Sequence, residues 1–140
     1  KVATPGGEST AWGGKCPPFD LDNGIPAKAA EILKMDCFTS KMVLEGGAIE
    51  SNGNGVLITT EAVLLNKNRN PGMSKADVEK ELKAMLGVET VFWLKNGIEG
   101  DDTDGHIDDM VRFVRSHLHG RDQGNRSKLQ SAQGKPGAPE

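Results

Sequence analysis

The clearest pattern of apolar and polar positions lies in the second half of the chain. From residue 75 to residue 86, apolar side chains recur at steps of three and four, which is the spacing of one face of an α-helix. Those apolar positions are Val78, Leu82, Met85 and Leu86. Ser74 followed by Asp77 is a capping-box pattern, and Gly87 is a typical residue to end the helix. The pattern therefore predicts a helix that begins after Ser74 and ends before Gly87.

Elsewhere the apolar spacing predicts strands. Residues 88–94 (VETVFWL) are β-rich and almost continuously apolar, which favours a strand buried on both faces. Residues 48–51 and 55–60 flank the sequence NGNG, a strong signal for a β-hairpin. Short apolar runs at 42–44 and 107–114 also favour strands, although one helical turn remains open for the second of them.

A second helix is expected nearer the start of the chain, over residues 25–35. Pro26 falls in a tolerated first-turn position, and Ala29, Ile32 and Leu33 share one face. Cys37, just beyond, is interpreted as a small core residue, whereas Cys16 lies between Lys15 and Pro17 in a loop where a free thiol is plausible. Helix, hairpin, helix and strand in this order predict an α/β fold made of mixed ββαβ-type units.

Composition limits the class of protein. The 140 residues suit one domain, and 17 basic against 20 acidic residues give a net charge of −3, too mild to indicate a nucleic-acid partner. No apolar run approaches the length of a membrane span, so no membrane partner is expected and a cytoplasmic location is the default. We expect residues 1–10 to be a flexible lead-in, 11–114 to form the domain, and the polar residues 115–140 to be disordered.

Candidate chemistry concentrates in an acidic loop, residues 100–109, which holds five carboxylates and one histidine. If the segment is extended, His106 and Asp108 project on the same side, as general acid and base chemistry requires. A solvated loop with an incidental histidine is the alternative. A calcium loop is not favoured, because the position of the bidentate glutamate would be Val111.

Three residues outside this loop also suggest a site. Glu45 precedes Gly46 and Gly47, whose missing side chains allow a ligand or another backbone to come close, although a glutamate in this setting more often lies in an exposed turn. Trp12 is either a flat wall for a planar cation or a core tryptophan. Arg69, in a turn before Pro71, is placed to pin a nearby carboxylate.

Four segments together resemble the bacterial agmatine deiminases, within the peptidyl-arginine deiminase family of guanidino-group modifying enzymes. In chain order they are AWGGKCPPFDLDN, LEGGAIESNGNGVLITTE, LLNKNRNP and LGVETVFWLKNGIEGDDTDGHIDDMVRFV. The resemblance implies a pentein, a five-bladed ββαβ propeller, of which this chain would supply about one and a half to two blades. It also implies hydrolysis of agmatine to N-carbamoylputrescine and ammonia, a step of putrescine and polyamine biosynthesis, with no metal or organic cofactor.

The resemblance assigns roles to individual residues. A cysteine thiolate attacks the guanidinium carbon to form a thiouronium, His106 is the general acid and base, and Glu45 and Asp108 bind the guanidinium nitrogens. Asp102 faces the distal amine of agmatine, and stands where the family carries a longer glutamate; Trp12 is a further substrate-binding candidate.

The family's nucleophilic cysteine segment, a Gly-rich run ending in His-Cys, has no counterpart here, and neither Cys16 nor Cys37 occupies its position. A chain that is inactive alone is therefore expected, whether a truncated or frameshifted gene product or an excised piece of a longer one, with a homo-oligomer or a complementary chain as candidate sources of the missing blades. A peptidyl-arginine deiminase and a non-catalytic module for guanidinium binding or subunit interaction remain the alternatives.

Overall fold

The computed structural model describes residues 3–6 and 10–114, so the expectations for the tail at 115–140 lie outside the described residues. Three strands form the central sheet in the order β3, β4, β5. β3 (Ile49–Ser51) and β4 (Val56–Thr60) are antiparallel, and β5 (Thr90–Leu94) lies parallel to β4. Because parallel neighbours need a crossover, the chain passes from β4 to β5 through α3 (Glu61–Leu64) and α4 (Lys75–Leu86). The mixed α/β class is thus confirmed.

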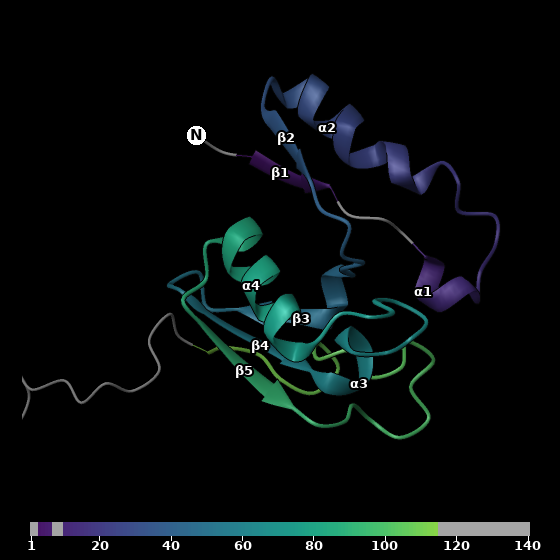
Figure 1. Ribbon diagram of the computed structural model, residues 1–140, viewed down its shortest axis with the longest axis vertical. Coiled ribbons are helices and arrows are strands. Elements are labelled where there is room, and N and C mark those ends of the chain that lie inside the picture. The colour runs from purple at the N-terminus through teal and green to yellow at the C-terminus, as the bar shows by residue number, and fades with distance from the viewer. Residues whose placement is uncertain (1–2, 7–9, 115–140) are drawn as a thin grey trace, which may run out of the picture.

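The hydrophobic core fills the space between this sheet and α4, which lies over it in Figure 1. Val78 and Leu82 of α4 and Leu57 of β4 are completely buried. The rest of the buried cluster consists of Met42, Ala48, Val63, Leu64 and Val88. Both the hairpin at NGNG and the helix from Lys75 to Leu86 are confirmed as predicted from the sequence.

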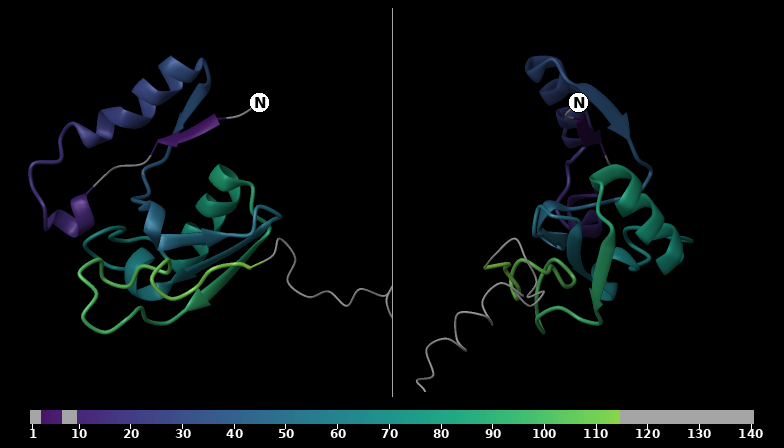
Figure 2. Two further views of the ribbon diagram at one scale, coloured as in Figure 1. Left: turned by 180° about the vertical axis from the view of Figure 1, so that it is seen from behind. Right: turned by 90° about the vertical axis from the view of Figure 1, so that its left-hand side faces the viewer.

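A second, two-stranded sheet pairs β1 (Ala3–Gly6) with β2 (Asp36–Thr39) in parallel. Helix α2 (Ile25–Leu33) lies between these two strands in the chain and directly precedes β2. This unit lies beside the central sheet, as the three views in Figure 1 and Figure 2 agree. The segment expected as a flexible lead-in therefore includes a strand. The helix expected over residues 25–35 is confirmed in essence, and ends where Lys34 adopts a left-handed φ of 52°.

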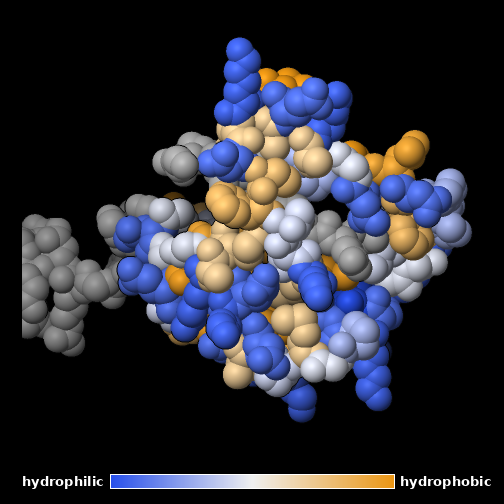
Figure 3. Space-filling view, turned by 45° about the horizontal axis from the view of Figure 1, so that its top comes forward, coloured by the Kyte–Doolittle hydropathy of each residue, from blue (hydrophilic) through white to orange (hydrophobic). Residues whose placement is uncertain are grey.

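Burial in this second unit differs from the sequence prediction. Ile32 and Leu33 are 70% and 61% exposed, and the single buried residue of α2 is Ala30. The prediction that Cys37 is a core residue is wrong, since Cys37 lies exposed in β2. The apolar face of α2 lacks a cover among the described residues, and apolar side chains show between hydrophilic ones in the space-filling view of Figure 3.

Two predicted strands are absent from the described part of the chain. Residues 42–44 do not pair with a strand, because the side-chain amide of Asn70 takes both backbone groups of Val43, accepting at 2.9 Å from its N–H and donating at 3.1 Å to its C=O. Residues 107–114 contain one turn at 108–110 in place of a strand, and the N–H groups of Met110 and Val111 both donate to Ile107 O at 3.0 Å.

The prediction that residues 88–94 are buried on both faces is also wrong. Burial alternates along β5: Val91 and Trp93 pack against the core, whereas Phe92 and Leu94 are 47% and 39% exposed. The strand thus has one covered and one open face among the described residues, which a continuous apolar run does not distinguish from two covered faces.

Candidate functional site

The acidic loop is a folded turn built on the carboxylate of Asp101. This carboxylate accepts hydrogen bonds from the Thr103 N–H at 2.9 Å, the Thr103 hydroxyl at 2.5 Å, and the N–H groups of Gly105 and His106, both at 3.0 Å. Burial alone would raise the pKa of Asp101, but these hydrogen bonds outweigh it and lower the pKa to about 2. Asp101, which the sequence did not single out, therefore fixes the backbone that presents His106.

Three hydrogen bonds attach this turn to the central sheet and to the 3-10 turn that precedes β3 (Gly46–Ala48). The Thr60 hydroxyl at the end of β4 donates to Gly105 O at 2.6 Å, and the N–H groups of Ile107 and Asp108 donate to Gly47 O at 3.1 and 3.2 Å. Gly105 has a φ of 112°, a region that favours glycine. The result places His106, which is 6% exposed, directly over Gly47.

His106 is paired with a carboxylate from a distant part of the sequence. Its Nε2 lies 2.6 Å from Oε2 of Glu45, and its Nδ1 lies 3.9 Å from Oδ1 of Asp108. A Cβ at position 47 would come within 2.5 Å of His106 Nδ1 and 2.9 Å of Asp108 Oδ2, so only glycine allows the two loops to meet here. The structure thus brings together the three residues that the sequence predicted for catalysis.

Arg69 holds the other side of Glu45. Its Nε donates to Oε1 at 3.0 Å and its Nη2 to Oε2 at 3.1 Å, while Nη1 donates to Asp104 Oδ2 at 2.5 Å and Nη2 to Thr103 O at 3.0 Å. Burial alone would lower the pKa of Arg69, but its hydrogen bonds to Glu45 and Asp104 raise it above the ordinary value. The expectation that Arg69 pins a nearby carboxylate is confirmed.

Asp104 connects the acidic loop to the turn that carries Trp12. Its carboxylate accepts from Lys15 Nζ at 2.8 Å and from the Asn68 amide at 3.1 Å, in addition to Arg69. Partial burial would raise its pKa, but the hydrogen bonds from Lys15, Arg69 and Asn68 lower it to about 2. This anchored turn is α1 (Ala11–Gly14), in which Trp12 has a left-handed φ of 58°.

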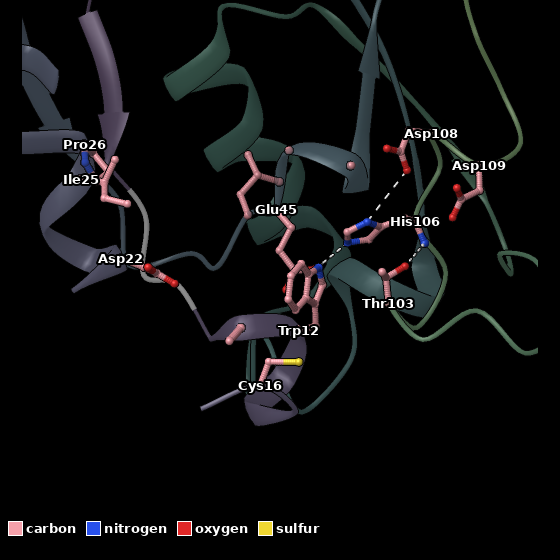
Figure 4. A pocket seen from close by; sticks show the side chains of 14 residues that line it. Trp12, Cys16, Asp22, Ile25, Pro26, Glu45, Thr103, His106, Asp108 and Asp109 are labelled. Carbon is pink, nitrogen blue, oxygen red and sulfur yellow. Dashed lines mark hydrogen bonds and ion pairs between the residues drawn. The ribbon is translucent and has the colours of Figure 1, made fainter. Parts of the chain in front are cut away.

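These elements surround a cavity of about 730 Å³, shown in Figure 4. Trp12, which is 44% exposed, forms part of its wall, and Glu45 and His106 line it as well. Its further lining residues include Cys16, Asp22, Ile25, Pro26, Leu44, Gly46, Gly47, Thr103, Asp108 and Asp109. The cavity thus combines a flat aromatic surface with several carboxylates, a combination suited to a planar cation.

Asp102, to which the resemblance assigns a substrate-binding role, does not line this cavity. It lies instead on an adjacent hollow of about 420 Å³ that shares Trp12, Cys16 and Thr103 with the first and also includes Lys15. Its backbone carbonyl accepts from Lys15 Nζ at 2.6 Å. No group of three or more His, Cys, Asp or Glu side chains suited to a metal ion occurs within residues 3–6 and 10–114.

Comparison with known proteins decides the family. The model of the Porphyromonas-type peptidyl-arginine deiminase family matches residues 8–120. The chain belongs to this family. It is 49% identical over 111 residues to an agmatine deiminase of Medicago truncatula, and 44% identical over 110 residues to one of Pseudomonas aeruginosa. Each match covers 75% of this chain but only 29% and 30% of the relative, so the chain spans about a third of these deiminases.

Solved deiminase structures have the same fold. The agmatine deiminase of Enterococcus faecalis matches 87% of this chain and 35% of its own, with 35% identity and a TM-score of 0.73. An agmatine deiminase of C. jejuni with substrate bound matches 80% of this chain and 34% of its own, with 38% identity and a TM-score of 0.71. Among the described residues, no helix is both long and apolar enough to cross a membrane.

Proposed function

We propose that this member of the family binds the guanidinium group of agmatine and contributes the histidine and carboxylate part of a deiminase site. The observation that carries the proposal is the contact of 2.6 Å between His106 and Glu45 in the wall of a cavity that also exposes Trp12 and Asp108. In a site of this kind, Asp108 and Glu45 accept hydrogen bonds from the guanidinium, Trp12 covers its plane, and Asp102 receives the distal amine.

The reaction proposed for the complete site is hydrolysis of agmatine to N-carbamoylputrescine and ammonia, as in putrescine biosynthesis. A thiolate bonds to the guanidinium carbon, and the C–N bond breaks as His106 transfers a proton to the departing ammonia. His106 then takes a proton from water, whose oxygen bonds to the thiouronium carbon while the thiolate leaves. The part of the pentein that these residues would form, about one and a half to two blades, is likewise a proposal.

We further propose that the nucleophilic thiolate comes from outside residues 1–140 and that these residues alone do not turn over agmatine. Cys37 does not line the cavity, whereas Cys16 does. Ammonia release from agmatine should therefore be absent in the wild-type chain, with a full-length deiminase as the positive control. Turnover that disappears in Cys16→Ser but persists in Cys37→Ser would contradict this and make Cys16 the nucleophile.

Isothermal titration calorimetry with agmatine tests the binding function separately from turnover. Asp108→Asn should weaken agmatine binding by about tenfold, because a charge-assisted hydrogen bond becomes a neutral one. Asp20→Asn is the matched control, since Asp20 is exposed and does not line the cavity, and its affinity should equal that of the wild type. Putrescine, which lacks a guanidinium, should bind more weakly than agmatine. Equal affinity for the two would overturn the proposal.

The peptidyl-arginine substrate class has one observation in its favour, namely the name of the matching family. Titration with a peptide containing arginine, beside agmatine, separates the two classes by relative affinity. Binding of either ligand without turnover, even when complementary blades are supplied, would favour a non-catalytic guanidinium-binding module. The predicted homo-oligomer or complementary chain is tested by sedimentation velocity of the chain with and without the missing part of the deiminase.

A further inference from the structure

We infer that Arg69 is a positioning residue for the histidine–carboxylate pair: it holds Glu45 in the orientation that presents Oε2 to His106. Arg69 does not line the cavity, and its side chain is 1% exposed, so it does not contact a ligand there. Its action reaches the site through Glu45. The inference deepens the proposed function and rests on it only for the identity of the ligand.

The geometry of Glu45 is the first step. Arg69 contacts both carboxylate oxygens, with Nε on Oε1 and Nη2 on Oε2, which is the bidentate arrangement of a guanidinium and a carboxylate. His106 Nε2 then uses the same Oε2. A carboxylate offers about four acceptor directions, and three of them are taken. A rotation of Glu45 about its last bond would break two bonds to Arg69, so the contact with His106 is fixed.

Charge is the second step. Glu45 is only 14% exposed at its side chain, and a carboxylate so placed needs a compensating cation. Arg69 is that cation, and it remains protonated under all ordinary conditions. Because Arg69 donates to both oxygens of Glu45, Oε2 faces His106 as an acceptor, and we therefore place a ring proton of His106 on Nε2, with Nδ1 lying 3.9 Å from Asp108 Oδ1.

The third step concerns the ligand. With three acceptor directions of Glu45 occupied, at most one remains for a substrate guanidinium, so most of the guanidinium contacts fall to Asp108, whose side chain is 34% exposed. Arg69 also binds Asp104 and Thr103 O, in the turn just before His106. The buried guanidinium of Arg69 therefore orients His106 in two ways. It holds Glu45, the partner of the His106 ring, and it holds the turn that carries the His106 backbone.

The test uses the ring ¹⁵N signals of His106, assigned by their loss in His106→Asn, in Arg69→Lys, Arg69→Gln and the control Arg112→Gln. Arg112 is the matched control because it pairs with another largely covered glutamate, Glu50, while its own side chain is exposed and does not line the cavity. We expect the wild type and Arg112→Gln to show a proton fixed on Nε2. In Arg69→Gln the proton should be shared between Nε2 and Nδ1, and agmatine binding should weaken by about tenfold.

Arg69→Lys keeps the cation but cannot fill both oxygens at once, so its ring signals and affinity should fall between those of the wild type and Arg69→Gln. A proton that stays on Nε2 in both variants, with unchanged agmatine affinity, overturns the inference. Loss of folding in both variants while Arg112→Gln folds also overturns it, in favour of a purely structural role. If the wild type does not bind agmatine, the proposed function fails, but the ring signals still decide the role of Arg69.

Discussion

Gly47 sets the distance between the two loops that carry the candidate site. It accepts from the N–H groups of Ile107 and Asp108, and the space where its Cβ would lie is filled by the His106 ring and the Asp108 carboxylate. The neighbouring Gly46 lies in the same 3-10 turn, yet a Cβ there would meet no atom within 4 Å. The two adjacent glycines look alike in the sequence, but only position 47 has no room for a side chain.

Gly47→Ala should therefore disturb the site far more than Gly46→Ala. A methyl group at 47 must displace His106 or Asp108, which we expect to cost about 1–3 kcal/mol in the free energy of unfolding and to reduce agmatine affinity. Gly46→Ala is the control for stability and should leave the free energy of unfolding almost unchanged. Urea unfolding and calorimetry of the two variants measure both effects. An equal free energy of unfolding in the two alanine variants would show that the two loops can move apart without loss of stability.

At the residue scale, the sequence predicted the chemical groups better than their partners. Glu45, His106 and Asp108 meet as expected, and Arg69 pins a carboxylate as expected. The distinct contacts of Asp101 and Asp104 were not predictable, because the aspartates of one acidic run look alike until the backbone turns. Asp101 then faces inward to its own loop, whereas Asp104 faces Arg69 and Lys15.

At the element scale, α4 shows how local signals decide a boundary. Ser74 accepts from the Asp77 N–H at 3.2 Å, and the Asp77 carboxylate accepts from the Ser74 N–H at 2.9 Å, which is a complete capping box. Both capping residues lie within four positions of each other, so the sequence alone was sufficient to predict where α4 begins. The strand predictions for 42–44 and 107–114 were wrong because the groups that bind their backbones lie far away along the chain. These groups are the side chain of Asn70 and the carbonyl of Gly47.

Ser74→Ala should lower the free energy of unfolding by about 1 kcal/mol, because it leaves the N–H of Asp77 without its cap. Ser74→Thr retains a capping hydroxyl and is expected to unfold within a few tenths of a kcal/mol of the wild type. Agmatine affinity should be the same in both, since Ser74 does not line the cavity. The comparison needs chemical denaturation with a far-ultraviolet signal, and an alanine variant as stable as the threonine variant would contradict it.

At the scale of the whole molecule, the sequence could not show which apolar faces are covered. Both faces of β5 were expected to be buried and α2 was expected to have an apolar face, yet Phe92, Ile32 and Leu33 are substantially exposed among the described residues. Periodicity reports that a face is apolar, but it does not report whether another layer lies on it. The chain spans about a third of its curated relatives, so the prediction of further covering blades is a matter for experiment.

The response of the whole molecule to acid is argued from Asp101 and Asp104, which both have a pKa of about 2 in the folded state. An unfolded aspartate has a pKa of about 3.9, so folding favours the ionised form, and each group stabilises the protein fully above about pH 4. That stability is lost as the pH falls from about 4 to about 2. Glu50 and Asp77, whose pKa values are also lowered, add to the same trend.

Asp101→Asn should therefore flatten the acid limb of the stability curve. The variant is expected to be less stable than the wild type at pH 7, because an amide cannot accept the four hydrogen bonds of the Asp101 carboxylate as well. The two free energies of unfolding should converge as the pH falls from about 4 to about 2, where the wild-type carboxylate is protonated too. Urea denaturation across this range measures the convergence, with Asp20→Asn as the exposed control. Parallel curves for Asp101→Asn and the wild type would mean that Asp101 titrates alike in the folded and unfolded chains, and that the acidic loop is not built on its charge.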